Sequence, residues 1–507
     1  MQQVFRLLDF NIYNENITND DDDNNEPSFN SNQSRFLIQM FGIDEVGDSY
    51  SVIIENYKPF FYILVGDDWN ISKKDEFLEN IKSKMGYYYK DTITGCIIVK
   101  RKKLYGFDGG KTYKFIRLEF SNIAALNKAK GLWYGEWNKN GSGRKLLPNG
   151  YVFKSTNTKL YEANIPPLLR FIHIKDISPS GWVALPVKDI VEVAEESKTT
   201  NCKYEYIVEC KNIIPLNNKE TRVPYKICSF DIEASSSHGD FPVPIKSYKK
   251  LALNIVDYFE NNKMVKDVFI SILRRIIFTA FGYDNLPNID IVYPITNPAK
   301  QSMECLFERL LISNIKTTNE FQNIVTIESL FEKMRLDDDN EDDTYHKNRP
   351  SYVNNDNITI IDILTDVNME REHKLIGINT ILNSVFPKLH GDKVTFIGST
   401  FTTYGNTENY LNNCIVLNTC EDISTENTVI ESYSSEKQVL LAWQQLIQRE
   451  DPDIIIGYNI FGFDYEFMFR RSQELDCVED FLKLSRNNDE LCATVDYKNP
   501  GKIDIDR

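Results

Sequence analysis

The chain has 507 residues, of which 42% are hydrophobic and 26% are charged, and its formal net charge is −16. This length predicts about three domains, and the composition is that of an ordinary globular protein. The negative charge excludes nucleic-acid binding through an overall positive surface, because phosphate contacts need clustered Lys and Arg. Two acidic runs, Asp20–Asp23 and Asp337–Asp343, supply much of this charge and are typical of solvated loops.

The nine cysteines are scattered and form no Cys-x-x-Cys pair, so neither a zinc site nor a disulfide framework is expected. Reduced thiols fit a cytosolic or nuclear protein. The first ten residues lack the pattern of a secretory signal. The most apolar helical run, Val268–Phe281, is too short and too charged to cross a membrane, so no membrane partner is expected.

Residues 1–215 are predicted to form a β-rich N-terminal domain. It begins with a strand over 1–13, followed by an Asn- and Asp-rich stretch, 14–34, that is predicted to be a disordered loop. A helix is predicted over Ser72–Lys84, with Ser72 as its N-cap. Runs rich in β-branched and aromatic residues predict further strands at Ser51–Ile54, Phe60–Val65, Cys96–Lys100 and Tyr113–Phe120.

A second unit is predicted over 216–507, and a mostly helical insertion over 245–390 interrupts it. Apolar residues recur at helical spacing in two parts of this insertion, at Val265, Val268, Phe269, Ile272, Leu273, Ile276 and Ile277 and again at Met303, Leu306, Phe307, Leu310 and Leu311. The other predicted elements of the unit are strands at 227–233, 393–398 and 453–457 and helices at 435–449 and 464–475.

Two carboxylates end the first strand of this unit, Asp231 and Glu233. Residues two apart on a strand share a face, so both side chains are expected to point the same way while Phe230 and Ile232 pack behind them. Two hard carboxylates at this place suit Mg²⁺ or Mn²⁺. The alternative is an ordinary strand end that enters a loop.

A third carboxylate, Asp464, follows a buried strand and a turn and stands at a predicted helix start. There it would point toward the carboxyl edge of the sheet, where α/β proteins usually place their sites. The alternative is that Asp464 is simply a helix N-cap. Both motifs in this order, each on the expected element, are more specific than either alone.

These motifs resemble the first two exonuclease motifs of family B DNA polymerases. The similarity rests on Phe230–Glu233 followed by Gly239–Pro242, and on Asp451–Asp453 followed by Tyr458, Asn459 and Asp464. Further likeness lies upstream, at Arg35–Asp44, Lys58–Tyr62, Tyr161–Asn164 and Arg170–Phe171. The chain is most similar to the delta-type catalytic subunit and its relatives in large DNA viruses, and its Asn-, Ile- and Lys-rich sequence favours a viral source.

The resemblance implies an α+β and α/β multidomain protein with an RNase H-like 3′–5′ exonuclease domain. It implies a proofreading nuclease that uses two Mg²⁺ or Mn²⁺ ions. Asp231, Glu233 and Asp464 would be catalytic residues and metal ligands. Asn459 and Phe463 match positions that hold the frayed 3′ end, although Asn459 is equally well explained as a turn residue.

The family's third exonuclease motif, Tyr-x-x-x-Asp, and its polymerase palm motifs are not found in the 507 residues. The exonuclease domain is therefore expected to be incomplete, and these residues alone are expected to have weak or no nuclease activity. The expected partners are a DNA primer-template, a single-stranded 3′ end, the missing C-terminal part of the polymerase and a sliding clamp. The expected location is the host cytoplasm or the nucleus.

Basic and aromatic residues interleave from Lys100 to Arg117, a pattern that can bind nucleic acid. A hairpin with a solvated lysine face explains the same pattern and is the preferred interpretation. The five histidines show no metal-ligand spacing, and His238 is expected in a loop. Two other functions stay open for the whole chain: a stand-alone RNase H-like nuclease, and a non-catalytic module that binds nucleic acid or a replication partner.

Overall fold

The computed structural model of the chain describes residues 1–16, 34–103, 109–137, 144–236, 239–262, 266–316, 357–421, 423, 425–488, 490–495 and 503–505. His238, the acidic run Asp337–Asp343 and most of the predicted loop 14–34 lie outside these residues. At the edges of that loop the prediction is wrong, because β1 continues to Asn16 and β2 begins at Ser34.

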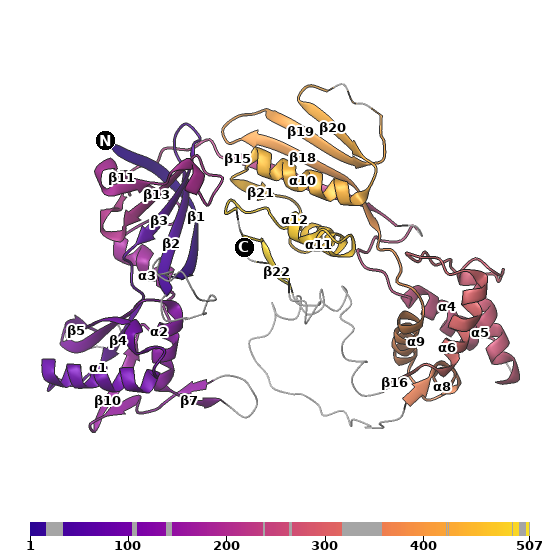
Figure 1. Cartoon of the computed structure of the whole chain (residues 1–507), viewed down its shortest axis with the longest axis horizontal. Helices are drawn as coiled ribbons and strands as arrows, with labels where there is room; N and C mark the ends of the chain where they lie inside the picture. Colours follow the sequence, from indigo (N-terminus) through magenta and orange to yellow (C-terminus); the bar gives the residue numbers. More distant parts are fainter. Residues whose placement is uncertain are drawn as a thin grey trace, which may run out of the picture.

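The first half of the chain builds a seven-stranded sheet with the order β12-β13-β3-β2-β1-β11-β14, seen at the N-terminus in Figure 1. Its interior strand β2 is buried at nearly every position, and the helix α3 (Pro167–Lys175) supplies Phe171 to the same core. The strands are β1 (Gln2–Asn16), β2 (Ser34–Ile43), β3 (Ser49–Glu55), β11 (Trp182–Pro186), β12 (Ile190–Glu192), β13 (Tyr204–Glu209) and β14 (Ile214–Pro215).

A second sheet, β5-β6-β4-β10-β9, packs against α1 and α2 through a core rich in aromatic rings. The predicted helix Ser72–Lys84 is α1 (Ile71–Met85), but its N-cap is Asn70 rather than Ser72, since the Asn70 side chain accepts from Lys73 N. The other elements are β4 (Phe60–Leu64), β5 (Ile93–Lys102), β6 (Thr112–Phe120), α2 (Ile123–Lys130), β9 (Tyr151–Phe153) and β10 (Thr156–Tyr161).

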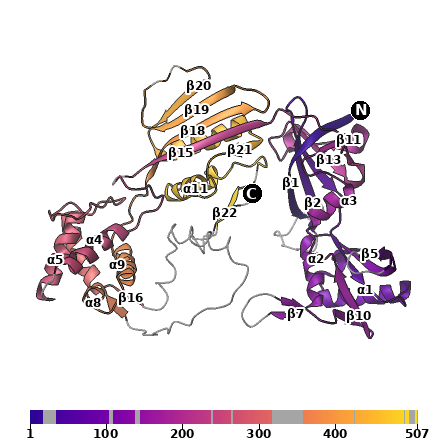
Figure 2. The ribbon, with the colours of Figure 1, turned by 180° about the vertical axis from the view of Figure 1, so that it is seen from behind.

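The third sheet, β20-β19-β18-β15-β21, is mixed. Its strand β15 (Lys226–Ser235) runs antiparallel to β18 (Lys393–Thr403) and parallel to β21 (Ile454–Ile456), as Figure 2 shows from behind. The remaining elements are β19 (Asn409–Leu417), β20 (Thr428–Tyr433), α10 (Glu436–Glu450), α11 (Asp464–Glu474) and α12 (Val478–Phe481). A β-rich first half followed by a mixed sheet with helices confirms the predicted fold class.

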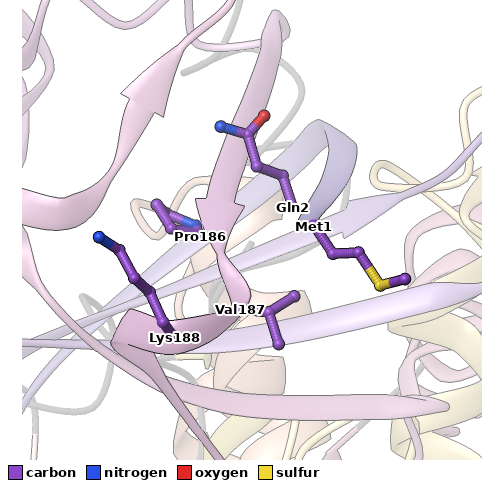
Figure 3. Close-up of a pocket in the computed structure, with 5 residues that line it drawn as sticks. All are labelled: Met1, Gln2, Pro186, Val187 and Lys188. Carbon is purple, nitrogen blue, oxygen red and sulfur yellow. The ribbon is translucent and has the colours of Figure 1, made fainter.

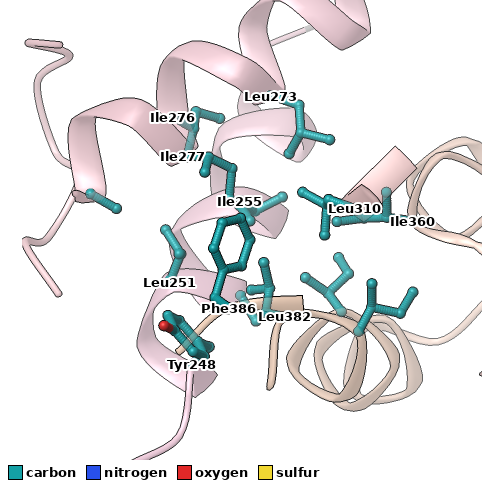
Figure 4. Packing of buried hydrophobic residues seen from close by; sticks show 14 of the residues in the cluster. Tyr248, Leu251, Ile255, Leu273, Ile276, Ile277, Leu310, Ile360, Leu382 and Phe386 are labelled. Carbon is teal, nitrogen blue, oxygen red and sulfur yellow. The ribbon is translucent and has the colours of Figure 1, made fainter. Parts of the chain in front are cut away.

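Between β15 and β18 the chain forms a group of helices with a hydrophobic core of its own, whose buried members run from Tyr248 to Leu389 (Figure 4). Of the residues predicted at helical spacing, Leu273, Ile276 and Ile277 are buried in it, whereas Val268 is exposed. The elements are α4 (Lys249–Asn261), α5 (Lys266–Ala280), α6 (Lys300–Ile312), β16 (Asn314–Lys316), β17 (Asn357–Thr359), α8 (Ile360–Thr365) and α9 (Arg371–Val385).

Two further short strand pairs are β7 (Tyr134–Trp137) with β8 (Arg144–Leu146), and β22 (Ala493–Val495) with β23 (Ile503–Ile505). Within the described ranges, no helix combines the length and the apolarity that a membrane crossing needs.

Candidate functional site

At the acidic end of β15, buried and exposed side chains alternate as the sequence predicts. Phe230 and Ile232 are only 3% and 5% exposed, whereas Asp231 and Glu233 are exposed on the other face. The pairing of β15 with β18 shifts register directly after Glu233. A β-bulge of this kind bends its strand and re-aims side chains, so Glu233 stands at the point where the strand changes direction.

The turn after β21 brings a second segment to this edge. An added Cβ on Gly457 would lie 2.7 Å from the Phe230 carbonyl oxygen, so only glycine lets the chain leave β21 this close to β15. Asn459 follows with a φ of 55° and is exposed, and its carbonyl accepts from the backbone N–H groups of Gly462 and Phe463. These features give Asn459 the predicted turn role. A contact of Asn459 with DNA stays a prediction.

Asp464 is the first residue of α11 and is 1% exposed. The N-cap of this helix is Phe463 and makes no side-chain cap hydrogen bond, so the alternative that Asp464 is an N-cap is wrong. Burial raises the pKa of the Asp464 carboxyl to about 6, and the negative charge of Asp231 adds to the rise. The backbone N–H groups of Asp464 and Ile232 oppose it.

The structure thus brings Asp464 close enough to Asp231 for the charge of one carboxylate to disfavour ionisation of the other. The buried Oδ1 atom of Asp464 has no hydrogen-bond partner among the described residues. Two hard oxygen donors that repel each other, one of them with an unused buried oxygen, fit a divalent cation such as Mg²⁺. Glu233 does not complete a cluster, since no three His, Cys, Asp or Glu side chains in the described ranges are grouped to hold a metal.

Aromatic residues precede Asp464 in the chain, and one of them contacts a further ring. Phe463 is half-buried and contacts Phe241, with ring centroids 5.5 Å apart, although Phe241 is 74% exposed. Tyr458 and Phe461 in the preceding turn are 93% and 65% exposed. Sequence reasoning included Phe241 and Tyr458 in motifs but gave neither a role, because a loop sequence does not reveal whether an aromatic side chain is buried.

A buried ion-pair network fixes α11, the helix that begins at Asp464. The Arg471 guanidinium, 0% exposed, donates to both carboxylate oxygens of Glu436 on α10 at 2.8 and 2.7 Å. It also donates to Glu474 at 2.6 Å and to the Pro244 carbonyl at 3.2 Å. Because Glu474 accepts in turn from Gly391 N, the network contacts both ends of the helical segment between β15 and β18.

The acids of the Asp451–Asp453 motif have a structural partner. Arg486 donates to Asp451 at 2.8 Å and to Asp453 at 2.6 Å. Asp453 also accepts from Lys226 N at 2.7 Å, which ties the start of β21 to the start of β15. These acids support the sheet and do not join Asp231 and Asp464.

A surface pocket elsewhere does not coincide with this site. It lies where β1 begins beside the end of β11 and is lined by Met1, Gln2, Pro186, Val187 and Lys188 (Figure 3). None of these residues is a carboxylate, so the pocket offers no ligand set for a hard cation.

Residues 158–282 and 338–498 match the family model of the DNA polymerase family B exonuclease domain. These two segments make up more than half of the chain and contain Asp231, Glu233 and Asp464. The chain belongs to DNA polymerase family B. The resemblance of its motifs to this family is thereby confirmed.

Viral and eukaryotic polymerases are similar over different parts of this family B chain. A DNA polymerase of Phaeocystis pouchetii virus is 40% identical over 99% of the chain and 50% of its own length. A DNA polymerase of Pyramimonas orientalis virus is 31% identical over 95% of the chain and 37% of its own length. The DNA polymerase delta catalytic subunit of Schizosaccharomyces pombe is 27% identical over 46% of the chain and 21% of its own length. The chain spans half or less of each of these relatives.

Proposed function

We propose that the chain forms the N-terminal and 3′–5′ exonuclease part of a DNA polymerase that acts in DNA replication. The observation that carries this proposal is the buried Asp464 carboxylate close to Asp231, with an Oδ1 atom that has no hydrogen-bond partner among the described residues, inside the segments that match the exonuclease domain. A stand-alone nuclease is less well supported, because the viral relatives that cover nearly the whole chain are DNA polymerases of greater length.

In the proposed site, Asp231 and Asp464 would hold Mg²⁺ or Mn²⁺, and Glu233, which is not grouped with them in the metal-free structure, would have to move toward the ion to add a ligand. Two such ions, when bound, stabilise the attacking and leaving oxygens of a phosphodiester that is being cut. The residues of the chain must keep the two carboxylates ionised and oriented, and the buried position of Asp464 serves this orientation. The exposed ring of Phe241 beside Phe463 would stack on the 3′-terminal base.

Titration with Mn²⁺, followed by electron paramagnetic resonance, tests the metal site directly. We expect the wild-type chain to bind Mn²⁺, and Asp231→Asn and Asp464→Asn to weaken binding by roughly tenfold or more, which is about 1.4 kcal/mol. Asp480→Asn removes a carboxylate on α12 that pairs with Lys483 and serves as the matched control. Equal binding by all four proteins would contradict the proposal and favour a non-catalytic module.

We further propose that residues 1–507 alone degrade DNA weakly, because no third metal-binding side chain is grouped with Asp231 and Asp464 among the described residues. A single-stranded DNA degradation assay with Mg²⁺ tests this. Robust turnover that Asp231→Ala abolishes would overturn the claim of weak activity while supporting the nuclease assignment. Turnover that Asp231→Ala leaves unchanged would come from another nuclease in the sample.

A further inference from the structure

We propose that the distal end of the β5–β6 hairpin binds the phosphate backbone of a nucleic-acid strand. The surface consists of Lys100, Arg101, Lys102, Lys103 and Lys111, which we call the basic hairpin end. This inference rests on the proposed function in one respect, namely that nucleic acid is the partner. It does not depend on the metal site, because the surface is remote in sequence from Asp231 and Asp464 and needs no metal.

The strand register gathers these cations. Lys100 pairs with Lys114, Arg101 with Tyr113, and Lys102 with Thr112 across β5 and β6. Lys103 directly follows Lys102 and Lys111 directly precedes Thr112, so both lie just beyond the last of these pairs. Their Nζ atoms are 3.9 and 5.3 Å from the centre of the Tyr113 ring. Five positive charges therefore occupy one end of a two-stranded ribbon.

None of the five has an acidic partner within the part of the chain that the structure describes. Two nearby cations on β6 do have partners. Lys114 donates to the carbonyls of Asp67 and Trp69 at 2.6 and 2.8 Å, and Arg117 pairs with Glu119 at 3.0 Å. Like charges that face each other across a ladder, such as Lys100 and Lys114, destabilise a sheet. An anionic ligand would remove this repulsion.

Protection of a sheet edge does not explain the arrangement. β5 is the edge strand of its sheet, and lysines commonly keep such edges from pairing with other chains. Here the charges occupy only the last three residues of β5, while Ile97 in its middle is 48% exposed. The positive charges are also not confined to the edge strand, since Lys111 lies just before the interior strand β6.

The geometry points to phosphates rather than to bases. Tyr113 already carries two ammonium groups near its ring, and Phe115 is 3% exposed in the core. These two aromatic residues therefore do not offer the open faces that base stacking needs. Tyr105 and Phe107 lie outside the described residues. In a chain of net charge −16, this cluster is the kind of local positive surface through which a polyanion can still bind.

Fluorescence anisotropy with a labelled single-stranded oligonucleotide, in EDTA and at 50 to 200 mM KCl, tests the proposal. The hairpin variant carries Lys100→Gln, Arg101→Gln, Lys102→Gln and Lys111→Gln. The control variant removes the same charge at exposed sites elsewhere, with Lys188→Gln, Lys211→Gln, Lys437→Gln and Lys483→Gln. Thermal unfolding of both variants checks that the fold is kept.

We expect the hairpin variant to bind the oligonucleotide roughly tenfold or more weakly than the wild type at the lowest salt concentration. The slope of log K against log salt should become shallower by up to about 3 units, because each lost phosphate contact removes about 0.7. The control variant should keep the wild-type slope, and dA and dT oligonucleotides should bind alike. Equal slopes for the two variants, or no binding by the wild type, would overturn the proposal. Because EDTA removes divalent ions, this result is independent of the Mn²⁺ titration, which alone decides the metal site.

Discussion

Asp464 combines two properties that both disfavour its ionised form in the metal-free protein. It is almost fully buried, and it lies against the carboxylate of Asp231, so both burial and charge raise its pKa to about 6. At neutral pH the folded chain must nevertheless hold it ionised. A bound cation would reverse this cost. The residue that suits metal binding should therefore lower the stability of the protein without metal.

The change Asp464→Asn tests this conflict through its dependence on pH. An unfolded carboxyl of this type has a pKa of 3.8, so between about pH 4 and 6 the folded state binds more protons than the unfolded state, and stability falls as pH rises. We expect the variant to gain on the order of 1–3 kcal/mol of unfolding free energy at pH 7 in EDTA. Urea unfolding should show that the gain shrinks as pH falls and disappears near pH 4.

Asp480→Asn is the control for this measurement. The pKa of the Asp480 carboxyl is lowered, first by its hydrogen bond to Lys483, so its removal should give no gain at pH 7. If Asp464→Asn were less stable than the wild type at pH 7, or if its effect were the same at every pH, the charge conflict at the site would not exist.

Part of the site could be predicted residue by residue, and part could not. The two-residue period of a strand places Asp231 and Glu233 on one face, with Phe230 and Ile232 behind them. The bulge directly after Glu233 has no sequence signature here, since neither Glu233 nor Ala234 has an unusual backbone preference. The partners of Asp451 and Asp453 were also out of reach, because Arg486 follows them by more than thirty positions in sequence.

At the scale of elements, α11 is held in place by more than its apolar face. Phe467 and Met468 are buried in the core of the third sheet, and Arg471 adds hydrogen bonds to α10 and to the backbone beyond β15. Replacing both members of such a buried pair by apolar residues is often harmless, whereas removing one member leaves an uncompensated charge. Glu436 would be that charge, since it is 4% exposed.

Removal of the Arg471 side chain should therefore be strongly destabilising. We expect Arg471→Ala to lower the free energy of unfolding by about 3–5 kcal/mol, measured by urea unfolding at pH 7. Arg449→Ala on α10 is the control, because Arg449 is 57% exposed and its pair with Glu450 should contribute less than about 1 kcal/mol. Losses of similar size in both variants would mean that the buried network adds no more than a surface ion pair.

Helices with a clear apolar period were predicted well, and their ends less well. Leu273, Ile276 and Ile277 repeat at helical spacing and lie in a core, because a period of 3.6 residues is a property of the sequence. The start of α1 was missed by two positions, since Asn70 and Ser72 are both good N-cap residues. Only the backbone decides between them, and it presents Lys73 N to Asn70.

At the scale of the whole molecule, the helical segment between β15 and β18 is joined to the third sheet at a narrow base. The backbone of Val243 exchanges two hydrogen bonds with Asp392, one from Val243 N to its carboxylate and one from Asp392 N to the Val243 carbonyl, each 2.9 Å long. Lys246 pairs with the same carboxylate at 2.5 Å. The two ends of the segment therefore lie side by side, and the segment has its own core between Tyr248 and Leu389.

This geometry predicts that residues 248–389 can be replaced by a short Gly-Ser linker while the third sheet stays folded. The replacement removes the whole separate core but keeps Val243, Lys246 and Asp392, so the base is still closed by its hydrogen bonds and ion pair. Closing a short loop in place of a long segment costs little entropy. Hydrogen exchange should show β15 and β18 protected to the same degree as in the complete chain. A matched control that also carries Asp392→Ala should show weaker protection at the end of β15 and the start of β18, because the linker would then join ends that only the Arg471 and Glu474 contacts hold together. If the linker variant lost protection of β15 even with Asp392 in place, the helical segment would be an integral part of the sheet's fold rather than a module set upon it.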